Sequence, residues 1–470
     1  MTFLFPILLA IAAVLLFGVL GDVVFQRTGI SSTLWLIVCG LLLGPVLGLF
    51  PREQAWELGP VLAATALCVL LDEIRDCLSW STLRRDLALA GPRAAISFGV
   101  SALSVTLVAG LAHEAGLAPE AFGWKHALLL GAVLAAPCAW IITPILQPIA
   151  PSAARIIHQE SVLGASAAIL WCSILIALFD PRAETALEAS IQLARSLLLG
   201  VGIGALATAL WVGFLFLLRS PAHHRLSTLA MSLIVFATAT QIGSSGAIAV
   251  LVFTLTLANV KAVFPRLPWA RMLEVPENPP GRQPLISFFV ASMFFVFTGL
   301  VLGPPWDLMV LSLLLCVILF PPRILAVLVG GHFARDSASG PSDRAFASVA
   351  IARGILAGAL SLLPFLVSME HSEYVSIPAF TVMAGSITIF TAAFAILSIR
   401  ENKRVINSIA QPHVQILHDK QSQQAFRSAS EEPIPPTTRS PSRDQGPRTS
   451  IDKPTRPLPP PVPPPRRHEK

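Results

Sequence analysis

Residues 122–179 read FGWKHALLLGAVLAAPCAWIITPILQPIAPSAARIIHQESVLGASAAILWCSILIALF, and this stretch decides the fold class. It is long enough to cross a bilayer twice, because a spanning helix needs about 20 apolar residues. Glu160 is its only acidic residue. A carboxylate at membrane depth costs about 2.5 to 3.5 kcal/mol on insertion scales, so it usually marks an ion path, a proton site or a buried pair. Arg353, the one basic residue inside a late apolar segment, is the partner we expect for it.

The composition agrees with an all-α polytopic membrane protein. Hydrophobic residues make up 54% of the chain and charged residues only 13%, which is more apolar surface than a soluble domain can bury. The six cysteines stand singly, without the paired spacings of zinc or redox motifs, and we interpret them as packing residues. We expect a transporter rather than an enzyme, with no metal centre and no cofactor.

A hydropathy scan with a window of about 19 residues predicts thirteen transmembrane helices. We place them near residues 3–22, 30–50, 58–72, 93–113, 125–149, 156–179, 189–218, 226–241, 246–263, 285–303, 306–331, 345–367 and 376–398. No basic segment precedes the first of them, so we interpret it as a retained helix rather than a signal peptide.

The basic residues of the loops support this count. Arginine and lysine concentrate in every second loop through all thirteen spans, as the positive-inside rule requires. The pattern places the N-terminus outside and the C-terminus in the cytoplasm of a multi-pass protein in the cell membrane, plasma or inner.

The composition changes abruptly near Arg400, so we predict a transmembrane domain over 1–399 and a disordered Pro/Arg-rich tail over 400–470. The tail holds 13 Lys and Arg against 7 Asp and Glu, a net of +6 that equals the net charge of the chain. The excess of basic residues is therefore confined to the tail and does not indicate nucleic-acid binding. Contact with anionic headgroups or with a proline-recognising domain is an alternative, and a solvated tail without a fixed partner is the favoured interpretation.

Two segments predict helices interrupted near the membrane midplane, where freed carbonyls and half-helix ends can coordinate ions. In the fifth span Pro137 removes a backbone hydrogen bond, and in the twelfth Gly354 follows Arg353. With the seventh span as connector, the two segments hold corresponding positions in two six-helix halves. This arrangement is typical of an inverted repeat.

The chain resembles the monovalent cation:proton antiporters of the sodium/hydrogen exchanger type. Seven short motifs carry the resemblance in order, namely Gly40-Leu-Leu-Leu-Gly-Pro45, Leu70-Leu-Asp-Glu73, Gly131-Ala-Val-Leu-Ala-Ala136, Glu160-Ser-Val-Leu163, Ser245-Gly-Ala-Ile-Ala249, Phe294-Phe-Val-Phe-Thr-Gly299 and Arg353-Gly354. The resemblance implies a homodimer in which a core domain of crossing, broken helices moves against a dimerisation domain. It also implies a carboxylate site that binds monovalent cations and protons alternately.

The acids of that site are missing here. The family pattern has a Thr-Asp pair at the fifth-helix break and an Asn-Asp or Asp-Asp pair after the Glu-Ser of the sixth. These positions are Pro137-Cys138 and Gly164-Ala165 in this chain. A buried carboxylate supplies both an anionic ligand and a titrating group, whereas Cys138 is a soft and poor substitute. Ser161, Ser166 and the opened backbone could offer only neutral oxygens.

Glu160 and Arg353 match family residues that resemble a structural ion pair, which is the role we favour for them. The alternative is that Glu160 has become the proton-titrating site, assisted by His158 or Ser161. The ion and proton site candidates are thus Glu160, Ser161, Cys138 and Ser166. We predict that Asp72 and Glu73 belong to a surface ion cluster. We predict that Arg323 snorkels to the membrane surface or caps a helix.

Three functions remain open on this sequence. The first is a secondary transporter that exchanges sodium or potassium for protons through an atypical site. The second is a transport-inactive relative that senses or scaffolds through its tail. The third is a transporter of an anion or neutral solute that passes Arg353.

Overall fold

The computed structural model describes residues 31–217, 224–263, 285–333 and 340–400, together with 12, 15–21, 23 and 24. The chain divides into two compact units, Met1–Val405 and Ile406–Lys470. The second unit lies outside the described residues, as does nearly all of the predicted tail at 400–470. The tail and the domain boundary therefore stay predictions.

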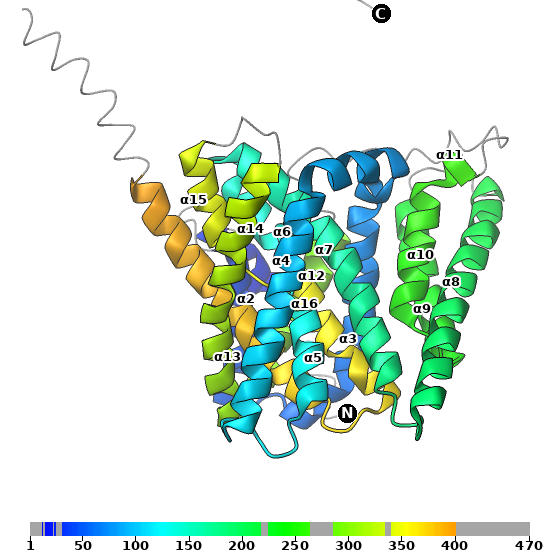
Figure 1. Ribbon diagram of the computed structural model, residues 1–470, viewed down its shortest axis with the longest axis horizontal. Coiled ribbons are helices and arrows are strands. Elements are labelled where there is room, and N and C mark those ends of the chain that lie inside the picture. The colour runs from blue at the N-terminus through cyan, green and yellow to red at the C-terminus, as the bar shows by residue number, and fades with distance from the viewer. Residues whose placement is uncertain are drawn as a thin grey trace, which may run out of the picture. The chain divides into compact units, whose positions relative to one another are not determined.

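Every regular element in the described ranges is helical, and the helices run side by side as a bundle (Figure 1). They are α2 (Ser32–Leu41) with a π-helical turn η1 (Leu42–Val46), α3 (Arg52–Ile74) with a 3₁₀ turn η2 (Arg75–Leu78), α4 (Trp80–Glu114), α5 (Trp124–Val133), α6 (Ala139–Leu146), α7 (Pro151–Leu178), α8 (Ala186–Leu217), α9 (His224–Gln241), α10 (Gly246–Ala258), α11 (Val260–Val263), α12 (Leu285–Val301), α13 (Trp306–Ile318), α14 (Phe320–Phe333), α15 (Pro341–Val349), α16 (Ile355–Ser361) and a 3₁₀ turn η5 (Leu363–Val367). A last helix covers Glu373–Arg400.

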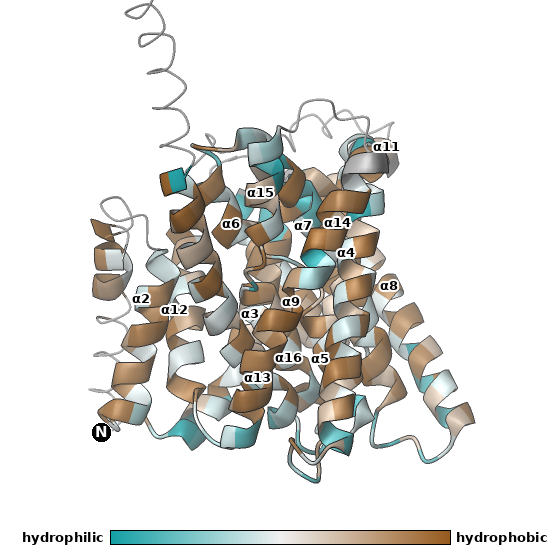
Figure 2. Ribbon diagram, turned by 60° about the vertical axis from the view of Figure 1, so that its left-hand side comes forward, coloured by the Kyte–Doolittle hydropathy of each residue, from teal (hydrophilic) through white to brown (hydrophobic). Residues whose placement is uncertain are grey.

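The helices have the length and apolar character of a multi-pass membrane protein. Within the described ranges, five are long and apolar enough to span a bilayer, namely Trp80–Glu114, Pro151–Leu178, Ala186–Phe214, Trp306–Gly330 and Glu373–Arg400. Shorter apolar helices fill the bundle at Ser32–Val46, Gly246–Ala258, Leu285–Val301 and Ile355–Val367. Figure 2 shows hydrophobic residues along the middle of the helices and hydrophilic residues gathered toward the two ends.

Twelve of the thirteen predicted spans correspond in order to a helix or to a pair of consecutive helices, and the first falls mostly outside the described residues. The fourth helix differs most, since it begins at Trp80 rather than near residue 93. A hydropathy window ends where charges such as Arg84, Arg85 and Asp86 begin, although the helical backbone continues through them. The scan therefore locates the membrane-embedded part of a helix and misses its polar extension.

Four predicted spans are each built from two α-helices. The fifth consists of α5 and α6, the ninth of α10 and α11, the eleventh of α13 and α14, and the twelfth of α15 and α16. The eleventh changes helix at Leu319, just before Pro321 and Pro322. Proline lacks an N–H and is best tolerated in the first turn of a helix, so the pair favours a new helix start here. This start places Arg323 in the first turn of α14.

Glycines allow α2 and α12 to cross at very short range. A Cβ at Gly40 would overlap the Val296 carbonyl, and a Cβ at Gly299 would overlap the Ile37 carbonyl. Both glycines belong to motifs that carry the family resemblance, and the structure gives them a packing reason. On the other side of the bundle α8, α9 and α10 pack against one another (Figure 1).

Candidate ion-binding site

The first interruption separates α5 from α6 at residues 134–138, which include Pro137. The hydroxyl of Ser161, on α7, lies against it. This hydroxyl accepts a hydrogen bond from the Ala139 N–H at 3.1 Å and donates one to the Pro137 carbonyl at 2.8 Å. Ser161 thus satisfies backbone groups that a broken helix leaves free, which is a positioning role.

The second interruption, at residues 350–354, lies directly against the first. The Cys138 N–H donates to the Ala352 carbonyl at 3.0 Å, and the Arg353 N–H donates to Ser386 Oγ on the last helix at 3.0 Å. A Cβ on Gly354 would overlap the Cys138 sulfur, so glycine permits this approach. We call residues 134–138 and 350–354, with the α7 segment that packs on them, the crossing.

Glu160 is fully buried at the crossing, and its ion-pair partner is Arg323. The Arg323 Nη1 donates to Glu160 Oε1 at 2.6 Å, and the Arg323 Nε donates to the Ala347 carbonyl at 2.8 Å. The guanidinium therefore ties α7 and α15 to the first turn of α14. The other carboxylate oxygen, Oε2, is buried without a hydrogen-bond partner.

The structure corrects the predicted ion pair, because the partner of Glu160 is Arg323 and not Arg353. No ion pair within 4.0 Å joins it to Glu160 among the described residues, although it lies near enough to interact electrostatically with Glu160 and Arg323. Arg323 was expected to snorkel or cap a helix at a membrane surface, yet its side chain is only 3% exposed. The side chain meets Glu160 and the Ala347 carbonyl inside the bundle, and these contacts account for its burial.

The positions that the resemblance assigns to the missing acids hold closely packed small residues. Cys138 and Ala165 are buried. A Cβ on Gly164 would lie 3.2 Å from the Ala136 Cβ and 3.9 Å from the Pro137 Cδ, so α7 rests on the first break here. The Ser166 hydroxyl donates to the Val162 carbonyl at 3.2 Å within α7. Among the described charged groups of the crossing, one carboxylate faces two guanidinium groups, a formal charge of +1.

A family model described as the transmembrane region of sodium/hydrogen exchangers matches residues 11–400. The chain belongs to the sodium/hydrogen exchanger family. No curated protein matches it.

Solved structures of antiporters share the fold of this exchanger-family chain. One is the sodium proton antiporter MjNhaP1 from Methanocaldococcus jannaschii at pH 8, with a TM-score of 0.60 and 18% identity over 83% of this chain and 99% of that one. An electron-microscopy structure of the same antiporter gives a TM-score of 0.60 and 17% identity over 84% of this chain and 98% of that one. At this identity the likeness establishes the fold, an inverted-repeat antiporter fold with crossing broken helices.

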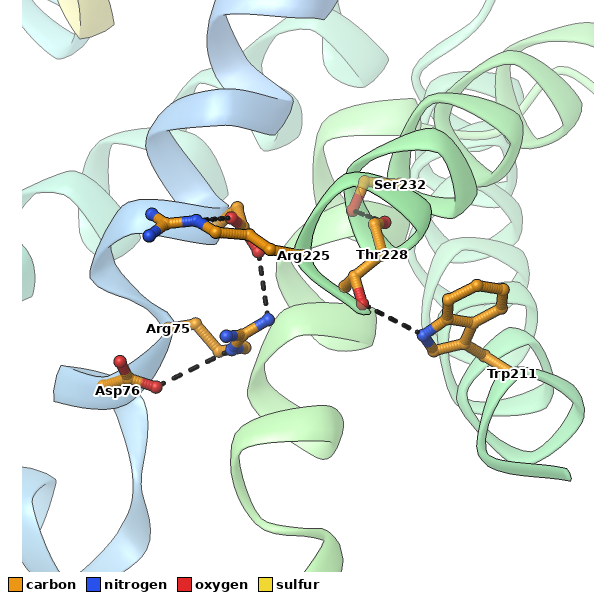
Figure 3. Close-up of polar contacts among 7 residues, drawn as sticks. Arg75, Asp76, Trp211, Arg225, Thr228 and Ser232 are labelled. Atoms are coloured by element: carbon orange, nitrogen blue, oxygen red, sulfur yellow. Dashed lines mark hydrogen bonds and ion pairs between the residues drawn. The ribbon is translucent and has the colours of Figure 1, made fainter. Parts of the chain in front are cut away.

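A second buried ionic cluster of this exchanger-family chain lies where α3 ends. Asp72 accepts hydrogen bonds from Arg75 at 3.0 Å and from Arg225, on α9, at 3.2 Å. Figure 3 shows Arg75 and Arg225 at this end of the bundle, with Arg75 also paired to Asp76. The Asp72 side chain is 7% exposed, so the predicted surface cluster is instead a buried link between α3 and α9. The sequence could not pair Asp72 with Arg225, because that contact spans 153 positions.

Other polar residues near this end of the bundle also find partners. Gln159 donates to the buried Asp86 carboxylate at 2.7 Å, and His158 Nε2 lies 3.5 Å from the Cys77 sulfur. His158 therefore contacts η2, and no described hydrogen bond joins it to Glu160. Of the two predicted helpers of Glu160, Ser161 is the one that hydrogen-bonds to the first break, where it has a positioning role.

Proposed function

We propose that this chain is a secondary transporter that exchanges a monovalent cation, sodium or potassium, for protons through an atypical site at the crossing. The observation that carries the proposal is the direct contact of two broken helices beside a fully buried carboxylate, the Cys138 to Ala352 hydrogen bond next to Glu160. Half-helix ends and freed carbonyls at such a contact are what transporters use to bind and release ions. Membership of the exchanger family supports the same class.

Glu160 is the residue we assign to proton binding. One of its oxygens is held by Arg323, and the other is buried without a hydrogen-bond partner. A free, desolvated carboxylate oxygen favours a proton or a cation as partner. Cys138 and the carbonyls of the two breaks offer neutral groups at the crossing, and Ser161 holds the first break in shape.

The topology of the transporter follows from the loop charges. In our proposal the N-terminus lies outside and the C-terminus in the cytoplasm of the cell membrane, and the chain forms a homodimer as the resemblance implies. It acts as a transporter without enzymatic activity.

The test is a transport assay on the full chain in liposomes. An imposed pH gradient should collapse when sodium, potassium or lithium is added, and Glu160→Gln should abolish the response. Glu188→Gln, an exposed glutamate at the start of α8, is the matched control and should behave like the unmodified chain. Cation-driven proton flux that survives Glu160→Gln intact would show that another group carries the proton.

A second candidate function has an observation in its favour, the formal charge of +1 at the crossing. A positive, buried site opposes the entry of a cation. This favours a transporter of an anion or neutral solute, or a transport-inactive relative that senses or scaffolds through its tail. The variant Cys138→Asp with Ala165→Asp separates these candidates. Cation exchange gained only in that variant would favour the second candidate over the first.

A further inference from the structure

The Arg353 side chain is a buried charge without an ion pair among the described residues. It is 2% exposed, its Nε has no hydrogen-bond partner, and no ion pair reaches it among the described residues. Guanidinium groups carry five N–H donors and stay charged, so a buried one normally meets a carboxylate or several carbonyls. Arg353 therefore needs a counter-charge that the described residues do not supply.

The neighbouring charges compensate it only in part. Glu160 is the one acid that acts on Arg353, and it is shared between two guanidinium groups, since its Oε1 accepts from Arg323 at 2.6 Å while its Oε2 makes no hydrogen bond to Arg353. The remaining group near Arg353 is Cys138, a thiol. In addition, α6 begins at Ala139, so its N-terminal end adds partial positive charge at the crossing. A ligand of one negative charge would bring the formal charge of the crossing to zero.

We propose that the crossing binds a small monovalent inorganic anion of the chloride type on the Arg353 guanidinium. The anion supplies the negative charge that the resemblance predicts from carboxylates at positions 138 and 165. A lipid headgroup does not suit the site, because the guanidinium is buried inside the bundle. The inference concerns the same crossing as the proposed transport site but does not require antiport, since it is a statement about binding.

The experiment measures thermal unfolding of the purified full chain in detergent, in sodium chloride against sodium gluconate at equal sodium concentration. A ligand that binds only the folded state raises the unfolding midpoint, so we expect a saturable rise of roughly 2 °C or more with chloride. Arg353→Gln should remove the rise. Arg52→Gln is the control and should keep it, because Arg52 donates to the Val301 and Pro304 carbonyls outside the crossing.

A second variant keeps the test decisive if Arg353→Gln fails to fold. Cys138→Asp places a carboxylate beside Arg353, so it should raise the midpoint in gluconate and lose the response to chloride. An unmodified chain that shows no chloride effect would overturn the inference, as would a chloride effect that persists in Cys138→Asp. Neither result depends on whether the chain transports cations, so failure of antiport and failure of anion binding are distinguishable.

Discussion

Removing the acid of the Glu160 and Arg323 pair should harm the protein more than removing the base. Glu160→Leu leaves Arg323 and Arg353 buried together without a carboxylate. Arg323→Met leaves one carboxylate and one guanidinium, which can compensate each other. The structure thus predicts an asymmetry that a simple isolated ion pair would not show.

The magnitudes follow from the contacts. Leaving one buried charge unpaired costs about 3 to 5 kcal/mol, and Glu160→Leu should reach at least that range because two like charges remain. Arg323→Met loses its hydrogen bond to the Ala347 carbonyl, roughly 1 kcal/mol, while Arg353 remains near Glu160. The two variants should differ by about 2 kcal/mol or more in the free energy of unfolding.

The assay is thermal unfolding in detergent, with the folded fraction followed by size-exclusion chromatography after heating. Glu57→Leu, at an exposed glutamate of α3, is the control and should stay close to the unmodified chain. The double variant Glu160→Leu with Arg323→Met should recover part of the loss, since it leaves a single guanidinium. The reasoning is refuted if Arg323→Met unfolds at the same temperature as Glu160→Leu or below it.

Three further predictions concern the crossing and the ionic link at the end of α3. Gly354→Ala should destabilise the chain by about 1 to 3 kcal/mol because its Cβ overlaps the Cys138 sulfur, and adding Cys138→Ala should restore part of the stability in the same unfolding assay. Ser161→Ala should cost about 1 to 3 kcal/mol through two lost hydrogen bonds at the first break, whereas full stability would show that Ser161 does not hold it. Asp72→Asn should loosen α3 from α9 and raise hydrogen exchange in both helices, while Asp76→Asn, whose side chain is 73% exposed, should leave exchange unchanged.

Much of this fold could be predicted from the sequence, because a membrane helix can be recognised from the hydrophobicity of its own residues. Hydropathy predicts thirteen spans, of which twelve correspond to helices in the described residues, and Pro137 and Gly354 mark segments that the structure shows to be interrupted. These features depend on neighbours within one helix. The double proline at 321 and 322 is an equally local indication of a helix start, but it does not show which neighbours Arg323 meets.

The ion pairs could not be predicted in the same way, because a pairing is decided by how helices meet in space. Arg323 and Arg353 are both arginines in late helices beside helix-breaking residues, and charge pattern alone does not rank them as partners of Glu160. The contact geometry does, since the start of α14 aims Arg323 at Glu160 while Arg353 sits in the second break. Likewise, the link from Asp72 to Arg225 depends on α9 lying against the end of α3.

The most direct test of the central claim is proton flux through liposomes that contain the full chain, recorded with an interior pH indicator as sodium or potassium is added outside. Cation-dependent proton release from acid-loaded liposomes, absent from empty liposomes and lost in Glu160→Gln, is the result that this account predicts. The contradicting result is an unmodified chain, folded and inserted, whose interior pH does not respond to any monovalent cation.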